Sequence, residues 1–162
     1  TLIVNKDIPD VIEDKNTIEE NAKKKAEECY KVFKSPIISD DSGLFVDALD
    51  GQPGVHSKRY AGLGSTDVEN NEKLINELKT ANNLSAFFKT VLCYFDGLNF
   101  ITSEGVLKGN IVFEPRGKNG FGYDPIFEVS GKTLAEMTLD EKSNISHRKL
   151  AAVELVVKLN EI

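Results

Sequence analysis

The fold is decided by residues 85–113, which read SAFFKTVLCYFDGLNFITSEGVLKGNIVF. Apolar and β-branched residues dominate Phe87–Phe95 and Leu98–Ser103, and Asp96-Gly97 separates the two runs. Because an Asp-Gly pair supplies the positive φ angles of a tight type I′ turn, we predict a β-hairpin here. The similar segment Val106–Phe113 is predicted to add a third strand to this meander.

Helices and further strands are predicted around the meander. Thr17 and Thr66 each begin a T-x-x-E capping box, so a helix is expected after each, the first reaching Lys34. A last helix is predicted over Ser146–Asn160, with a serine cap and with Leu150, Val153 and Val157 facing the core. Short strands are expected at Leu2-Ile3-Val4, Ile37-Ile38, Leu44-Phe45-Val46 and Ile126–Val129. Helices interleaved with strands around one core indicate an α/β fold.

Length and composition exclude several classes of protein. The 162 residues are the size of one globular domain, with 28 % charged and 40 % hydrophobic residues. A net charge of −6 argues against binding to nucleic-acid polymers, which depends on clustered Lys and Arg. Neither a membrane-spanning run nor a signal pattern is found, and Cys29 and Cys93 lack metal-site spacing, so we expect buried reduced thiols and a cytoplasmic location.

The acidic segment Asp40-Asp41-Ser42-Gly43 is the first candidate site. It follows a predicted strand, and we expect it to form a strand-end turn. Adjacent carboxylates repel each other unless a cation or hydrogen-bond donors compensate them, and Mg²⁺ prefers such oxygen ligands. The alternative is a solvated turn, since Asp, Ser and Gly all favour turns.

Two later segments are candidates for holding an anionic, ring-bearing ligand. Gly117–Asp124 combines Lys118 with three glycines and two aromatic residues that can stack on a base, although it lacks the Walker A pattern; the alternative is a long hairpin connection. Lys142 and Ser146-His147-Arg148 adjoin the start of the last helix, where free amides and positive potential attract anions. The alternative there is a capped helix start with solvated charges.

Four segments together resemble the inosine triphosphate pyrophosphatase family, in the family's order and over nearly the whole chain. They are Ser39–Leu49, Pro53–Gly62, Gly120–Phe127 and Ala135–Arg148. The resemblance implies one domain over residues 1–162 with an elongated mixed β-sheet flanked by helices, two lobes and an active-site cleft between them. It also implies a homodimer that uses Mg²⁺ to hydrolyse ITP, dITP or XTP to the monophosphate and pyrophosphate, which removes deaminated purines from the nucleotide pool.

The resemblance also implies roles for particular residues. Asp41 matches the catalytic residue and metal ligand, with Asp40 and Glu13 as further metal ligands. Nucleotide contacts are implied for Ser42, Lys25, Phe121, Gly122, Tyr123, Asp124, Lys142, His147 and Arg148.

One departure from the family pattern concerns the N-terminus. The family begins with a strand and a Thr/Ser-x-Asn-x-x-Lys turn that cradles the triphosphate, and this chain starts after that unit. We therefore expect an N-terminally incomplete domain. The alternative function is a non-catalytic purine-nucleotide-binding or dimeric interaction protein.

Overall fold

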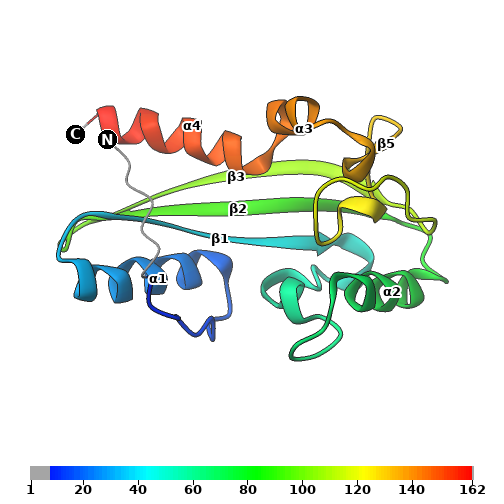
Figure 1. Ribbon diagram of the computed structural model, residues 1–162, viewed down its shortest axis with the longest axis horizontal. Coiled ribbons are helices and arrows are strands. Elements are labelled where there is room, and N and C mark those ends of the chain that lie inside the picture. Colours follow the sequence, from blue (N-terminus) through cyan, green and yellow to red (C-terminus); the bar gives the residue numbers. More distant parts are fainter. Residues whose placement is uncertain (1–7, 162) are drawn as a thin grey trace.

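The computed structural model describes residues 8–161, which form an elongated five-stranded sheet covered by helices (Figure 1). The strand order is β1-β2-β3-β4-β5, and every pairing within these residues is antiparallel, so the sheet that we expected to be mixed has no parallel pair here. The predicted strand Leu2-Ile3-Val4 lies outside the described residues. The elements are α1 (Ile18–Phe33), β1 (Ile37–Val46), η1 (Asp47–Leu49), η2 (Gly54–Arg59), α2 (Asp67–Leu78), β2 (Ser85–Phe95), β3 (Phe100–Ile111), η3 (Asp124–Ile126), β4 (Phe127–Val129), β5 (Lys132–Thr133), η4 (Leu134–Glu136), α3 (Leu139–Ile145) and α4 (His147–Asn160).

The predicted hairpin is confirmed, but its turn and its third strand differ from the prediction. Strands β2 and β3 pair from Ser85↔Asn110 to Phe95↔Phe100, so a four-residue loop replaces the two-residue turn. The Asp96 Oδ1 atom accepts two hydrogen bonds of 2.8 Å, one from the Leu98 amide and one from the Asn99 amide. These bonds satisfy backbone donors that would bond to the opposite strand in a tighter turn. The segments that we treated as two strands are one strand, because the ladder with β2 continues unbroken through Thr90↔Gly105.

Strand β1 corrects the expectation of a strand-end turn at the acidic segment. Residues Ile37–Val46 form one strand whose register with β2 places Asp40 opposite Leu92 and Asp41 opposite Val91. The ladder therefore outweighs the turn preference of Asp, Ser and Gly. An apolar pair such as Ile37-Ile38 is typical of a buried strand, but Ile38 is 38 % exposed.

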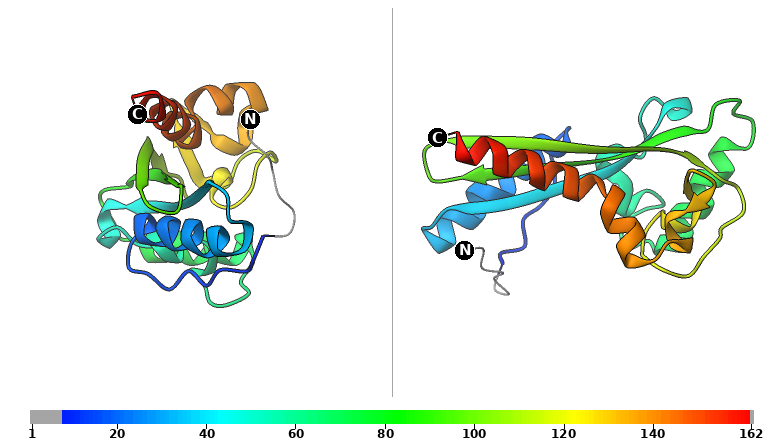
Figure 2. Two further views of the ribbon diagram at one scale, coloured as in Figure 1. Left: turned by 90° about the vertical axis from the view of Figure 1, so that its left-hand side faces the viewer. Right: turned by 90° about the horizontal axis from the view of Figure 1, so that it is seen from above.

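Helices α1 and α4 cover opposite faces of the sheet (Figure 2). The predicted capping box at Thr17 is present, and α1 buries Ile18, Ala22 and Ala26 against Val91 and Cys93 of β2. Both cysteines are buried and free, as expected.

Helix α4 follows the predicted range but uses a different face. The residues expected in the core, Leu150, Val153 and Val157, are 47–57 % exposed, whereas Ala151 and Leu155 are buried. Small residues set this orientation, because Gly105 of β3 lies directly under the backbone of α4 and Ser103 Oγ donates to the Ala151 carbonyl at 2.7 Å. Ser146 precedes the helix without a side-chain capping hydrogen bond.

The second hydrophobic core lies at the other end of the sheet, under α2 and the segment from η3 to η4. Leu74 and Leu78 of α2 pack there with Phe127 and Leu134. The short helix α3 was not predicted, although Thr138 and Glu141 form a capping box before it. No helix among residues 8–161 is long and apolar enough to span a membrane.

Candidate active site

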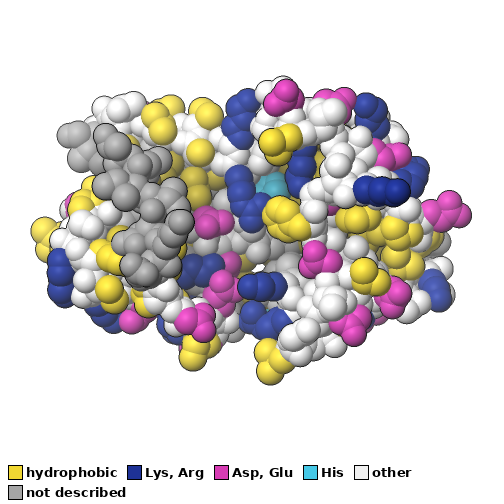
Figure 3. Space-filling view, in the orientation of Figure 1, with side chains coloured by type: hydrophobic (Ala, Val, Ile, Leu, Met, Phe, Trp, Pro, Cys, Tyr) yellow, Lys and Arg dark blue, Asp and Glu magenta, His cyan; other side chains and the backbone are white. Residues whose placement is uncertain are grey.

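A cavity of about 410 Å³ lies at the edge of β1, between the elements that cover the two faces of the sheet. Basic and acidic side chains gather in the middle of this face of the molecule (Figure 3). All of the predicted site residues line the cavity: Glu13, Lys25, Asp40, Asp41, Ser42, Phe121, Gly122, Tyr123, Asp124, Lys142, His147 and Arg148. Lys118, which sequence analysis also singled out, is not among the lining residues.

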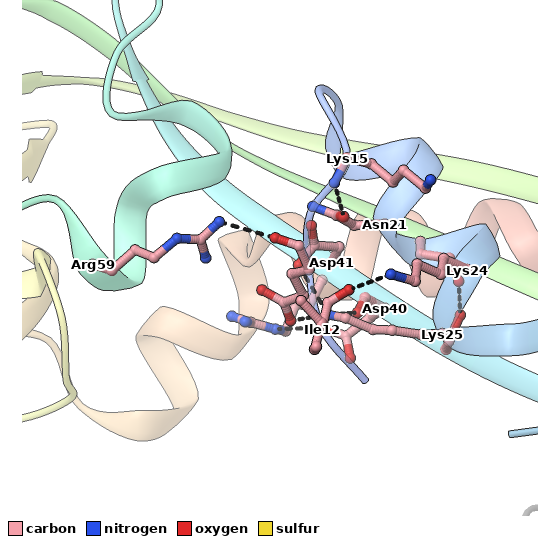
Figure 4. A network of polar contacts seen from close by, with 12 residues as sticks. Ile12, Lys15, Asn21, Lys24, Lys25, Asp40, Asp41 and Arg59 are labelled. Carbon is pink, nitrogen blue, oxygen red and sulfur yellow. Dashed lines mark hydrogen bonds and ion pairs between the residues drawn. The ribbon is translucent and has the colours of Figure 1, made fainter. Parts of the chain in front are cut away.

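An ammonium group lies between two carboxylates at one end of the cavity. Figure 4 shows Lys25 of α1 reaching toward Asp40 and Asp41 of β1. Lys25 Nζ lies 2.6 Å from Glu13 Oε1 and 3.0 Å from Asp41 Oδ1, and it donates to the Asp40 carbonyl at 2.9 Å. Burial opposes the charge of Lys25, yet its hydrogen bonds to Glu13 and Asp41 raise its pKa above the ordinary lysine value. Two carboxylate oxygens, one from the segment before α1 and one from β1, therefore converge on one cation position.

The Asp41 carboxyl is buried, with 8 % of the residue exposed. Burial raises its pKa, and the neighbouring Lys25 only partly offsets this effect. A carboxylate with a raised pKa binds a proton more readily than an ordinary aspartate, which suits a general base.

The segment that carries Glu13 is anchored from two sides. Arg59 Nη2 donates to the Glu13 carbonyl at 3.0 Å, and Lys24 Nζ donates to the Ile12 carbonyl at 2.8 Å (Figure 4). Asn21 Oδ1 accepts from the Lys15 amide at 3.0 Å. Its buried Nδ2 atom has no hydrogen-bond partner within the described part of the chain. These contacts fix Glu13 beside Lys25 although it lies outside a helix or strand.

Asp40 and Asp41 lie in different surroundings, because successive side chains of a strand point to opposite faces. Asp41 contacts Lys25 of α1, whereas Asp40 lies 3.7 Å from Arg148 Nε of α4, with about half of its side chain exposed. Ser42, on the same face as Asp40, shares a 2.6 Å hydrogen bond with Thr90.

The other end of the cavity presents an aromatic ring beside two cations. Phe121 is 65 % exposed, with Lys142 Nζ 5.0 Å and Arg148 Cζ 5.9 Å from its ring centroid. Asp124 is buried, forms an ion pair with Lys142, and accepts from the Phe121 amide at 2.9 Å. A flat, exposed ring with neighbouring donors is suited to stacking on a heterocycle.

His147 forms the floor at this end. It is buried and stacks on Phe88 with ring centroids 5.1 Å apart. Burial, reinforced by the charges of Arg148 and Lys142, lowers its pKa to about 4, so the imidazole is neutral at physiological pH. Its buried Nδ1 atom has no partner among residues 8–161, which leaves a polar atom available to a ligand.

Several further residues line the cavity and were not predicted from the sequence, including Lys58, Asp67 and Asn70. Asn70 is buried and ties two chain segments together, since its Oδ1 accepts from the Ala61 amide at 2.7 Å and its Nδ2 donates to the Lys58 carbonyl at 3.2 Å. The available signal for Asp67 and Asn70 was the capping box at Thr66, which places them in the first turns of α2, whereas Lys58 lies in η2.

The fold and cavity define an α/β protein whose cleft combines paired carboxylates with cations and an exposed aromatic ring. Comparison with protein families matches residues 2–158 to the Ham1 family. The chain belongs to this family.

Individual relatives agree with this assignment. The chain is 47 % identical over 158 residues to the dITP/XTP pyrophosphatase of Syntrophobacter fumaroxidans, covering 96 % of this chain and 68 % of the relative. It is 49 % identical over 151 residues to the protein of that name from Caldanaerobacter subterraneus subsp. tengcongensis, covering 90 % and 76 %. The solved structure of the Staphylococcus aureus Ham1 protein superposes with a TM-score of 0.89 at 41 % identity, covering 94 % of this chain and 81 % of that one.

Proposed function

We propose that this protein hydrolyses non-canonical purine nucleoside triphosphates, namely ITP, dITP and XTP, to the monophosphate and pyrophosphate. The observation that carries the proposal is the cavity itself, in which the Glu13-Lys25-Asp41 cluster and the Phe121 ring occupy opposite ends. A nucleotide needs this combination, with charged groups for its phosphates and a flat face for its base. Family membership and the names of the relatives agree with it.

The chemistry assigned to Asp41 is activation of water. Asp41 accepts a proton from water as the water oxygen bonds to the α-phosphorus, and the bond from that phosphorus to the bridging oxygen of pyrophosphate breaks in line. The raised pKa of Asp41 favours this proton transfer. Lys25 neutralises phosphate charge beside it.

The donor set fits Mg²⁺ at this end. Among residues 8–161 no group of three or more His, Cys, Asp or Glu side chains forms a metal cluster. Mg²⁺ commonly takes only one or two carboxylates and completes its shell with water and phosphate oxygens. Glu13 and Asp41 converge on the Lys25 ammonium and would hold the ion, whereas Asp40, which we expected as a further ligand, points to the other face of β1, toward Arg148. When bound, Mg²⁺ offsets the charge of the triphosphate oxygens.

Base selection is assigned to the aromatic end. A 6-oxo purine presents an acceptor, which suits the donors of Arg148 and His147, whereas the 6-amino group of adenine would face donors without a partner. Such a mismatch costs about 1–3 kcal/mol. Phe121 stacks on the base, and Ser42, Gly122, Tyr123, Asp124 and Lys142 complete the wall around the nucleotide.

The test is pyrophosphate release from ITP, XTP, GTP and ATP at equal concentrations, with Mg²⁺ and after chelation. We expect ITP and XTP to turn over at least about tenfold faster than ATP, the ratio that corresponds to 1.4 kcal/mol. Chelation should abolish the activity. Equal turnover of all four nucleotides would contradict the proposed specificity, and binding of inosine monophosphate without hydrolysis of ITP would point to a non-catalytic binding protein.

The family resemblance also supports a homodimer and a cytoplasmic location as proposals. The two buried free cysteines agree with a reducing compartment. Sedimentation equilibrium of the purified chain checks the dimer, with a mass near 17.9 kDa contradicting it.

A further inference from the structure

The Phe121 ring has little side-chain packing to hold its position, although Tyr123 and Asp124 of the same loop are buried. The Phe121 ring is 65 % exposed, and the flanking Gly120 and Gly122 have φ angles of 78° and 62°. A Cβ added at Gly122 would meet no atom within 4 Å, so close packing does not explain this glycine. The position of the ring therefore depends on hydrogen bonds to the loop backbone.

Besides the hydrogen bond from the Phe121 amide to Asp124, two hydrogen bonds to the loop backbone come from residues of α2, far away in sequence. Asp67 Oδ2 accepts from the Gly122 amide at 2.7 Å, and Asn71 Nδ2 donates to the Gly122 carbonyl at 3.1 Å. Asp67 and Asn71 are four residues apart and so lie on one side of the helix. They engage both polar groups of the residue that directly follows Phe121.

Asp67 and Asn71, which we call the clamp residues because they bond both polar groups of Gly122, differ in burial. Asn71 is 7 % exposed, whereas Asp67 lies at the exposed first turn of α2. The buried Asn71 Oδ1 atom has no partner within residues 8–161, so the hydrogen bond from Nδ2 to Gly122 is the side-chain contact by which this amide acts on the loop.

We propose that Asp67 and Asn71 are positioning residues that hold the Phe121 ring in place for the nucleotide base. The proposal rests on the proposed function for the identity of the ligand, but the positioning itself is measurable without any nucleotide. Neither residue touches the Glu13-Lys25-Asp41 cluster, so their loss weakens base binding and leaves the chemical step intact.

The first experiment measures the loop alone. The sequence contains no tryptophan, so F121W places a single tryptophan on the loop, which can be excited selectively at a wavelength where tyrosine does not absorb. In this background we expect Asp67→Ala and Asn71→Ala to lower the fluorescence anisotropy and to increase quenching by acrylamide. Asp67→Asn keeps an oxygen acceptor and should restore both values, and Glu72→Ala, at an exposed position of α2, serves as the matched control. Unchanged anisotropy and quenching in both alanine variants would overturn the proposal.

The second experiment uses the chain with its natural Phe121. We expect Asp67→Ala and Asn71→Ala to raise KM for ITP by about three- to tenfold, as the loss of one or two hydrogen bonds implies, with kcat within about twofold of the unaltered protein. A fall in kcat at unchanged KM would overturn the positioning role. Absence of ITP turnover in the unaltered protein would reject the proposed function instead, while the fluorescence experiment still decides whether the clamp exists.

Discussion

Replacing Gly105 by alanine should destabilise the protein, because no side chain fits between β3 and α4. A Cβ at this position would lie 2.6 Å from the Ala151 amide nitrogen and closer still to the His147 carbonyl oxygen, whereas ordinary contacts begin at 3.4 Å. Both are backbone atoms and cannot rotate away, so α4 must move by roughly 1 Å. Overpacking of this kind costs about 1–3 kcal/mol, less about 0.4–1 kcal/mol gained from the stiffer unfolded chain. At mid-range the net cost is about 1.3 kcal/mol, and at about 2–4 °C per kcal/mol for a domain of this size we expect the midpoint of thermal unfolding to fall by roughly 3–5 °C.

Thermal and urea unfolding followed by circular dichroism measure this effect. Lys108→Ala is the matched control, because Lys108 is an exposed position on the same strand. The movement of α4 also displaces His147 and Arg148, so KM for ITP should rise together with the loss of stability. If Gly105→Ala unfolds at or above the temperature of the unaltered protein, the inferred contact between the β3 and α4 backbones is wrong.

Four further changes test the site and its support. Asp41→Asn should lower kcat for ITP by about 10²–10⁴-fold, as expected for a lost general base. The unfolding midpoint should not fall, because burial already disfavours the charged carboxylate of Asp41. Retained turnover would remove Asp41 from the mechanism. Phe121→Ala should raise KM by about 5- to 150-fold through lost base stacking, and an unchanged KM would exclude stacking on this ring. For His147, burial lowers the pKa in the folded protein to about 4, below the ordinary histidine value of about 6.5. The unfolded chain therefore binds more protons between these two pH values, so the free energy of unfolding rises with pH across that window, by up to about 3 kcal/mol. His147→Gln should remove this slope in urea titrations. Thr90→Val should cost about 1 kcal/mol, measured by urea unfolding, because it leaves the Ser42 hydroxyl without its partner, and an unchanged stability would show that this bond contributes nothing.

Helices and turns that are determined by a few neighbouring residues could be predicted from the sequence. The capping boxes at Thr17 and Thr66 place α1 and α2, and the Asp96-Gly97 pair places the hairpin, because each signal acts within a few residues. Strand β1 was broken in the prediction at Asp40–Gly43, since turn preference is local whereas the ladder with β2 is not. The prediction of which face of α4 is buried was also wrong. Gly105, more than forty positions away in the sequence, determines which side of the helix approaches β3.

In the candidate site, too, the identity of the residues could be predicted from the sequence, whereas their contacts with distant parts of the chain could not. Its residues were collected by resemblance, and the structure brings them to one cavity, which spacing along the chain does not reveal. Asp67 and Asn71 escaped notice because polar residues four apart on a helix usually face solvent. Only the fold shows that they face Gly122.

Because β1 is one continuous strand, the site depends on the number of residues that precede Asp40 in the strand as well as on their chemical identity. Inserting or deleting one residue between Ile37 and Asp40 would shift the pleat by one step and exchange the surroundings of the two aspartates, although the composition of the segment hardly changes. The length of the loop Asp96–Asn99 has no such effect, because a longer connection there leaves the side chain of every paired residue on the same face of the sheet. Changes in chain length are therefore expected to accumulate at the hairpin tip and to be excluded from the edge strand, a pattern that distinguishes the two segments without any reference to activity.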